Sequence, residues 1–180
     1  MKIFFSAGVL TLISLLTFAL PSVASEIPKE LEGVMNLQHP DSALYVAGQP
    51  KSEDFAAFAK VGVVHVINLR PLHETPDLNE AAIVTKAGMA YYNIPIEWSS
   101  DLTRDNVKLF DTVLGKISNE KVLIHCSSSN RVGALMALRA AWLHNASIDE
   151  AIKTGESYGL TKLLPDVKKL LAEQPGQQNK

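Results

Sequence analysis

The sequence has a single cysteine, Cys126, so no disulfide can form within the chain. It also lacks a basic excess, because 17 Lys and Arg stand against 19 Asp and Glu. A mildly acidic chain is a poor candidate for binding DNA, RNA or an anionic lipid surface. Glycine-rich nucleotide fingerprints are absent, and the five histidines show no paired-ligand spacing with the acids. We therefore expect no nucleic acid, no metal and no other cofactor.

One long apolar run is present, at the start of the chain. Residues 1–24 carry a positive charge near the start, an apolar body at 3–20, and small residues at the end. This pattern predicts a signal peptide that is cut after Ala24. An uncleaved anchor is the alternative, since the apolar body nearly spans a bilayer, but Pro21 would break the helix. We expect a periplasmic or secreted protein with no stable membrane insertion after cleavage.

The chain beyond residue 24 is long enough for one domain with a proper core and too short for two. Residues 25–43 form an N-terminal segment in which 31–37 has the pattern of a short amphipathic helix, and Pro40 indicates a turn after it. The domain itself is expected at 44–173. The polar residues 174–180 are expected to be a frayed tail.

From residue 44 onward, strand patterns alternate with helix patterns. The expected strands are 44–47, 63–69, 89–96 and 122–124. The expected helices are 52–62, 79–87, 103–117, 134–144, 148–157 and 160–172. This alternation predicts an α/β fold, with a parallel sheet of about four strands flanked by helices on both faces.

The stretch 121–133, KVLIHCSSSNRVG, places Cys126 in a turn between an expected strand and an expected helix. The turn consists of small polar residues, namely Ser127, Ser128, Ser129 and Asn130. Backbone N–H groups at the start of a helix bind an oxyanion, and Arg131 adds a guanidinium that can contact two oxygens. The same field favours the thiolate form of Cys126, which is a nucleophile. An inert core cysteine is the alternative, but a Ser-rich turn ending in Arg argues against it.

Arg70 follows the expected strand 63–69 and stands just before Pro71. In open α/β sheets, ligands bind beyond the carboxyl ends of the strands, which is also where Cys126 should lie. Arg70 is therefore a candidate substrate contact, with a solvated strand-end Arg as the equal alternative. His73 and Glu74 come next in a loop, where a surface position is expected and a place at the rim of the pocket is the alternative.

HCSSSNRVG resembles the loop of protein tyrosine and dual-specificity phosphatases, in which five residues separate Cys from Arg and a Ser or Thr follows. This chain has four residues between Cys126 and Arg131, and Val132 stands in the place of the hydroxyl residue. Single-domain rhodaneses have the four-residue spacing as well. A bacterial subfamily of beta-lactamase-hydrolase-like phosphatases combines the short loop with Gly-Gln-Pro and Ile-Asn-Leu-Arg, present here at 48–50 and 67–70. The resemblance covers about residues 44–159.

The resemblance implies the compact fold of dual-specificity phosphatases and hydrolysis of a phosphorylated protein or a small phosphate ester through a thiophosphate intermediate. It implies that Cys126 attacks phosphorus, that Arg131 holds the equatorial oxygens, and that Asp101 is the general acid, with Glu97 as its alternative. Further substrate contacts are then expected from Ser127, Ser128, Ser129, Asn130 and Arg70. Two other hypotheses stay open: a rhodanese-like sulfurtransferase with a persulfide on Cys126, and a catalytically weak phosphate-binding module.

Overall fold

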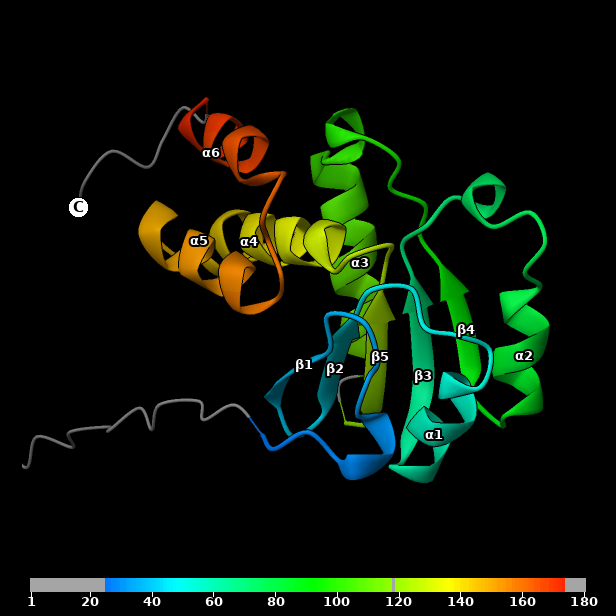
Figure 1. Cartoon of the computed structure of the whole chain (residues 1–180). Coiled ribbons are helices and arrows are strands. Elements are labelled where there is room, and N and C mark those ends of the chain that lie inside the picture. Colours follow the sequence, from blue (N-terminus) through cyan, green and yellow to red (C-terminus); the bar gives the residue numbers. More distant parts are fainter. Residues whose placement is uncertain (1–24, 118, 174–180) are drawn as a thin grey trace, which may run out of the picture.

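Four parallel strands and one antiparallel edge strand form a single sheet in the order β1-β2-β5-β3-β4 (Figure 1). The structure, a computed structural model, describes residues 25–117 and 119–173. The predicted signal peptide at 1–24 and the predicted tail at 174–180 lie outside the described residues. The strands are β1 (Gln38–Asp41), β2 (Leu44–Ala47), β3 (Val63–Asn68), β4 (Ala90–Asn93) and β5 (Lys121–His125). The predicted α/β class and parallel sheet are confirmed.

Helices cover both faces of this sheet. The α-helices are α1 (Asp54–Lys60), α2 (Glu80–Lys86), α3 (Arg104–Lys116), α4 (Asn130–His144), α5 (Ile148–Ser157) and α6 (Leu164–Ala172). Three short 3-10 helices are η1 (Lys29–Leu31), η2 (Leu72–Glu74) and η3 (Ser99–Asp101). In the part of the chain that the structure describes, no helix is long and apolar enough to cross a bilayer.

Neighbouring residues on the central strands serve two separate cores, because side chains alternate between the faces of a sheet. Leu123 packs with Phe55 and Phe58 of α1 and with Val84 of α2. Ile124, the next residue, packs in the larger core with the apolar faces of α3, α4, α5 and α6. This alternation explains why β5 reads as a continuous apolar run. It also places β5 in the centre of the sheet, between β2 and β3.

Several helix boundaries follow the capping residues in the sequence. The side chains of Asn79, Thr103 and Ser147 each accept a hydrogen bond from a backbone N–H in the first turn of the helix that follows. Such caps satisfy donors that have no partner inside the helix. Gly88 follows α2 with φ of +84° and Gly159 follows α5 with φ of +92°, a region that glycine adopts without strain. These predicted ends are confirmed.

The segment before β2 differs from the prediction. Residues 31–37 contain the end of η1 and turns instead of an amphipathic helix. Pro40 and Asp41 lie in β1, and the turn that they predicted follows them at 42–43. The ring of His39 stacks on Tyr45 with centroids 4.0 Å apart and bonds the Leu44 carbonyl through Nδ1 at 3.0 Å. Proline is tolerated on an edge strand. The sheet therefore has five strands rather than about four.

Helix α4 begins at Asn130, four residues before the predicted start at 134. Its first turn is packed tightly against the segment after α5, because Gly133 has no side chain. A Cβ atom on Gly133 would lie 2.2 Å from the backbone nitrogen of Leu160, and one on Gly155 would lie 2.8 Å from the Ala137 Cβ. This close approach fixes the start of α4, and with it the loop that carries Cys126.

Candidate active site

Cys126 lies at the carboxyl end of the central strand β5, and its side chain is fully buried. Its loop is held by the segment that follows β2. Gly48 forms an antiparallel bridge with Ser128, and the Gln49 N–H donates to the Ser127 carbonyl at 3.2 Å. A Cβ atom on Gly48 would stand 3.0 Å from that same Ser127 carbonyl oxygen. Gly48 and Gln49 of the Gly-Gln-Pro segment thus support the cysteine loop through backbone contacts.

The side chains of Ser129 and Asn130 hold the loop from outside. The Ser129 hydroxyl donates to the Asn36 carbonyl at 3.1 Å, and Asn36 Nδ2 donates to the Ser128 carbonyl at 3.3 Å. Asn130 Oδ1 accepts from the backbone N–H of Thr161 at 2.8 Å. Because these side chains are engaged elsewhere, Ser129 and Asn130 can bind a ligand through their backbone N–H groups. These groups lie at the start of a helix, where N–H groups have no acceptor within the helix.

Arg131 and Arg70, both predicted substrate contacts, are brought together by one acid, Glu74. Arg131 Nη2 lies 2.7 Å from Glu74 Oε1 and 2.9 Å from Oε2. Arg70 Nε donates to Glu74 Oε2 at 2.9 Å, and its Nη2 donates to the Glu74 carbonyl at 2.9 Å. The sequence left a surface loop or the rim of the pocket for Glu74; its side chain is 19% exposed and contacts both arginines, which agrees with the rim rather than with a freely solvated loop. Its place four residues after a strand-end Arg was the available signal, because residues at that spacing can meet in a short helical turn.

This cluster of two arginines and one carboxylate has a net charge of +1. Burial raises the pKa of Glu74, but hydrogen bonds from Arg131 and Arg70 outweigh it and hold that pKa below its ordinary value of 4.5. Glu74 is therefore ionised at neutral pH. Arg131 Nη1 is buried and makes no hydrogen bond to the residues that the structure describes. One charge-assisted donor thus remains for an oxyanion.

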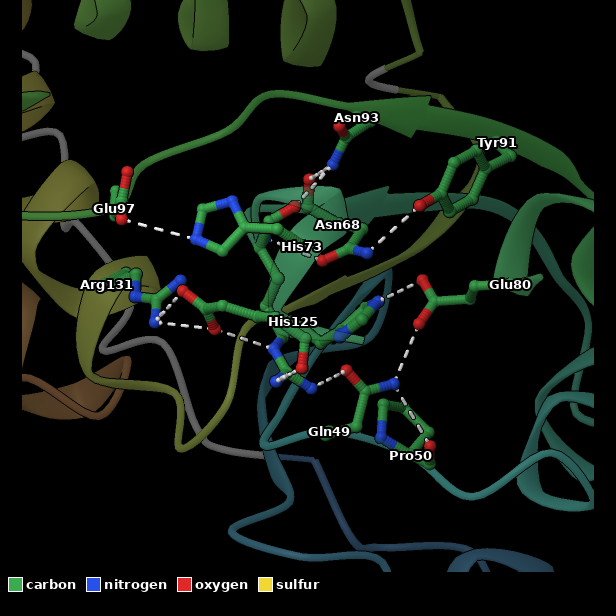
Figure 2. Close-up of polar contacts among 12 residues, drawn as sticks. Gln49, Pro50, Asn68, His73, Glu80, Tyr91, Asn93, Glu97, His125 and Arg131 are labelled. Atoms are coloured by element: carbon green, nitrogen blue, oxygen red, sulfur yellow. Dashed lines mark hydrogen bonds and ion pairs between the residues drawn. The ribbon is translucent and has the colours of Figure 1, made fainter. Parts of the chain in front are cut away.

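Arg70 is held in turn by Gln49, whose side chain Figure 2 shows next to Glu80 and His125. Its Nη1 donates to Gln49 Oε1 at 2.6 Å, and Gln49 Nε2 donates to Glu80 Oε2 at 2.7 Å. Glu80 Oε1 lies 2.8 Å from His125 Nε2, and both side chains are buried. None of these three partners was predicted as a site residue from the sequence.

The predicted general acid Asp101 ends η3, in the loop that follows β4. Its Oδ2 accepts from the backbone N–H of Glu97 at 2.7 Å and of Trp98 at 3.2 Å. Glu97, the alternative acid, pairs with His73 Nε2 at 3.3 Å, which ties this loop to the one that carries Glu74 (Figure 2). Both candidate acids therefore lie at the carboxyl edge of the sheet with Arg131. The Asp101 carboxylate bonds within its own loop, and the Asp101 carbonyl accepts from Asn106 Nδ2 of α3 at 2.8 Å.

No group of three His, Cys, Asp or Glu side chains among residues 25–117 and 119–173 could hold a metal ion. The chemistry of the described site rests on one thiol, two arginines and several carboxylates. A thiolate at the start of a helix can attack a tetrahedral oxyanion, while guanidinium and backbone N–H groups hold its oxygens.

Stability is expected to fall when the solution is made acidic, because Glu74 and Glu80 are both held as carboxylates. Burial raises the pKa of Glu80, but hydrogen bonds from His125 and Gln49 outweigh it, so both carboxyls have folded-state pKa values below 4.5. Their contribution is present above pH 4.5, the unfolded value, and is lost as the pH falls through the folded values. Thermal unfolding followed from about pH 7 to about pH 3 measures this loss. The variant Glu74→Gln, which lacks one of the two carboxyls, should show a shallower fall; an equal fall would contradict the assignment for Glu74.

Comparison with known proteins gives a consistent result. The model of the family described as "Beta-lactamase hydrolase-like protein, phosphatase-like domain" matches residues 37–142. A beta-lactamase hydrolase-like protein of Xylella fastidiosa is 32% identical over 120 residues, which are 64% of this chain and 27% of that protein. The chain thus spans about a quarter of the length of the relative it matches.

Two solved structures place the fold. A phosphatase candidate from Shewanella putrefaciens is 27% identical, with a TM-score of 0.64 over 80% of this chain and 93% of that one. The P. aeruginosa protein TpbA, crystallised as a cysteine-to-serine variant with phosphotyrosine, is 14% identical, with a TM-score of 0.56 over 86% of this chain and 98% of its own. The second likeness concerns the fold alone.

Proposed function

Because the chain belongs to the beta-lactamase hydrolase-like, phosphatase-like domain family, we propose that it is a cysteine-dependent phosphatase that hydrolyses phosphate monoesters. The observation that carries the proposal is the set of groups around one loop. A buried cysteine precedes a helix N-terminus, and Arg131 of that helix retains an unengaged donor within a cluster of net charge +1. This arrangement suits a group with several anionic oxygens.

The proposed reaction has two steps. The Cys126 thiolate attacks phosphorus, a P–S bond forms and the P–O bond to the leaving group breaks. Asp101 gives its proton to the leaving oxygen as that bond breaks. Water then attacks the thiophosphate, loses a proton to Asp101, and releases inorganic phosphate and the thiolate. Arg131 and the backbone N–H groups of the loop hold the equatorial oxygens in both steps.

An aryl phosphate such as phosphotyrosine in a protein is the proposed substrate class, supported by the phosphotyrosine bound to TpbA. Cys126 has no exposed surface in the described arrangement. An ester therefore reaches it only after part of the rim moves. We infer that loop 71–75 and loop 97–102, which the exposed pair His73 and Glu97 joins, form that rim.

Export is part of the same proposal. Its support is the charge, apolar body and small residues of 1–24, which have the pattern of a signal peptide. A phosphorylated substrate would then be met outside the cytoplasm.

A sulfurtransferase is the second candidate, favoured by two observations. Four residues separate Cys126 from Arg131, the spacing that rhodaneses share. Val132 is fully buried and packs in the core with Cys126, so its position provides no hydroxyl to assist a thiolate leaving group. A persulfide needs only one outer sulfur held near the loop, and no general acid.

Substrate tests on the purified domain separate the two chemistries. We expect slow hydrolysis of an aryl phosphate, inhibition by vanadate, and little transfer of sulfur from thiosulfate to cyanide. Mass spectrometry of Cys126 after each substrate identifies the covalent intermediate. A stable extra sulfur on Cys126 from thiosulfate, with the aryl phosphate untouched, would replace the phosphatase by the sulfurtransferase.

Exchanging Arg131 for lysine should lower kcat/KM for an aryl phosphate by about 10² to 10³, the usual effect of losing an oxyanion donor. An ammonium group lacks the planar pair of parallel N–H donors with which a guanidinium contacts two oxygens of one oxyanion, or Glu74 and a ligand together. Steady-state kinetics measures the effect. Arg139→Lys is the matched control, because Arg139 is on the same helix but pairs with Asp111 at 2.7 Å, away from the loop. Equal activity of both variants would place Arg131 outside the reaction.

A further inference from the structure

A directed chain of hydrogen bonds leads from the oxyanion site to a buried His on the other face of the sheet. It runs from Arg70 through Gln49 and Glu80 to His125 over distances of 2.6, 2.7 and 2.8 Å (Figure 2). At its outer end, Arg70 pairs with Glu74, which pairs with Arg131. Apart from the local pair of Arg70 with Glu74, the links join residues that are 21 to 57 positions apart in the sequence. This chain of hydrogen bonds therefore depends on the tertiary fold.

The direction of every bond in this chain is fixed by chemistry. A guanidinium group only donates, so Arg70 requires the carbonyl oxygen of Gln49 to face it. The amide nitrogen of Gln49 then faces Glu80, which must accept. Glu80 also accepts from His125 on its other oxygen, and its lowered pKa agrees with an ionised carboxylate at that place. With Gln at position 49 and Glu at position 80, the Arg70 donor at one end and the His125 donor at the other end each meet an acceptor oxygen.

The inner end of the chain does not touch the nucleophile. His125 lies beside Phe55, with ring centroids 6.2 Å apart, on the face covered by α1 and α2. Cys126, the next residue, packs in the core of the opposite face. The side chains of Gln49 and Glu80 therefore connect to the oxyanion site through Arg70 and Glu74.

We propose that Gln49 and Glu80 are positioning residues for the oxyanion site, acting through Arg70 and Glu74 on the guanidinium of Arg131. This inference rests on the proposed phosphatase function and names residues that act at a distance in it. The backbone of Arg70 is fixed as well, since Arg70 N–H donates to Asn68 Oδ1 and Asn93 Nδ2 donates to the Arg70 carbonyl. The side chain of Arg70 still has several rotatable bonds. Gln49 selects the rotamer that presents Nε to Glu74.

The variant Gln49→Glu tests the hydrogen-bond chain, because it replaces the amide donor that faces Glu80 by an acceptor. The new carboxylate can accept from Arg70, but its second oxygen then faces the Glu80 carboxylate across a partly buried contact that was 2.7 Å long. Two facing carboxylates repel, so Arg70 is drawn away from its place. We expect vanadate affinity to fall, and KM for an aryl phosphate to rise, by about tenfold, with a smaller change in kcat.

The exchange variant Gln49→Glu/Glu80→Gln should restore binding, because donors again meet acceptors. Arg70 donates to the new carboxylate at position 49, and the new amide at position 80 donates to the other oxygen of that carboxylate. The carbonyl oxygen of the amide at position 80 then accepts from His125. Net charge and side-chain volume match the wild type. A hydrogen bond from Gln49 Nε2 to the Pro50 carbonyl, 3.2 Å long, is lost in both variants and so cancels in the comparison. We expect vanadate affinity within about threefold of the wild type, since the two sites act as a coupled pair.

Three measurements test the proposal: vanadate affinity by titration calorimetry, KM and kcat for an aryl phosphate, and the melting temperature. A merely structural role lowers the melting temperature of Gln49→Glu and leaves KM and vanadate affinity unchanged, and that result overturns the proposal. An exchange variant as weak in binding as the single variant overturns it as well. If Gln49→Glu does not fold, Gln49→Met takes its place. We expect this variant to bind vanadate severalfold more weakly than the wild type. Unchanged vanadate binding would count against the proposed hydrogen-bond chain. Wild-type protein that neither binds vanadate nor turns over refutes the proposed function itself, and this inference with it.

Discussion

Replacing Cys126 by serine is expected to abolish hydrolysis of phosphate esters while the domain still folds. A serine hydroxyl is not an anion at neutral pH, so no P–Oγ intermediate forms at a useful rate. The change alters one atom in a fully buried position. Burying a hydroxyl there costs at most about 1–3 kcal/mol, and less where the loop amides bond it. Steady-state turnover of an aryl phosphate and the melting temperature measure the two effects.

The same variant should still bind inorganic phosphate. Arg131, Glu74 and the backbone N–H groups of the loop are unchanged, so only the nucleophile is lost. Calorimetric titration with phosphate therefore separates the loss of the nucleophile from the loss of the site. Turnover retained at the wild-type rate would exclude the phosphatase and the sulfurtransferase together, because both require the Cys126 sulfur.

Much of the fold could be predicted from local patterns. Capping residues such as Ser147 act on backbone groups three positions away, so their effect is visible in a short stretch. The apolar run before Cys126 likewise reports a strand that is buried on both faces. Helix α3 shows its buried side directly as apolar residues at helical spacing, which include Val107 and Phe110. In each case the physical cause lies within a few residues of the signal.

The parts that were missed depend on contacts between distant segments. β1 exists because His39 stacks on Tyr45 and because β2 offers an open edge, and neither fact appears in residues 25–43 alone. Helix α4 begins early because the segment after α5 packs on Gly133 and bonds Asn130. A turn of small polar residues looks like a loop until such a partner is in place.

The site shows the same division. Cys126 and Arg131 carry recognisable chemistry in one loop, and Arg70 has a position at a strand end. Glu74 has neither a recognisable motif nor a strand-end position, and an acid in a polar loop is usually solvated. Only the tertiary fold brings Arg131 to Glu74, from 57 positions away in the sequence. Gln49 was visible as part of Gly-Gln-Pro, yet its function in aiming Arg70 depends on Glu80, which is 31 residues further on.

Electrostatic repulsion explains why the Arg70 guanidinium needs a carboxylate partner at this site. Arg70 and Arg131 would repel each other if they were brought together alone, and Glu74 between them removes that repulsion. Since Glu74 balances only one of the two charges, the cluster still attracts an anion. A second carboxylate in contact with Arg131 would compete with the anion for its free donor. Glu80 is instead placed behind Gln49, where it fixes the amide without contacting Arg131.

The exchange Asp101→Asn is expected to lower kcat by about 10² to 10⁴ for an ester with a poor leaving group, which is the usual contribution of a general acid. A good leaving group such as nitrophenolate needs no proton, so the loss with its ester should be much smaller. Asn suits this test because its carbonyl oxygen can accept the two N–H groups, of Glu97 and Trp98, that Asp101 now binds. The turn is preserved while the proton is lost.

Two further variants complete the test of the general acid. Asp105→Asn makes the same chemical change in the exposed first turn of α3, four residues further along, and should alter kcat little for either ester. Glu97→Gln removes the alternative acid and its pairing with His73. If Asp101→Asn slows both esters equally, Asp101 acts by holding its loop. If the leaving-group dependence appears in Glu97→Gln instead, proton donation is assigned to Glu97, whose carboxylate pairs with His73 (Figure 2).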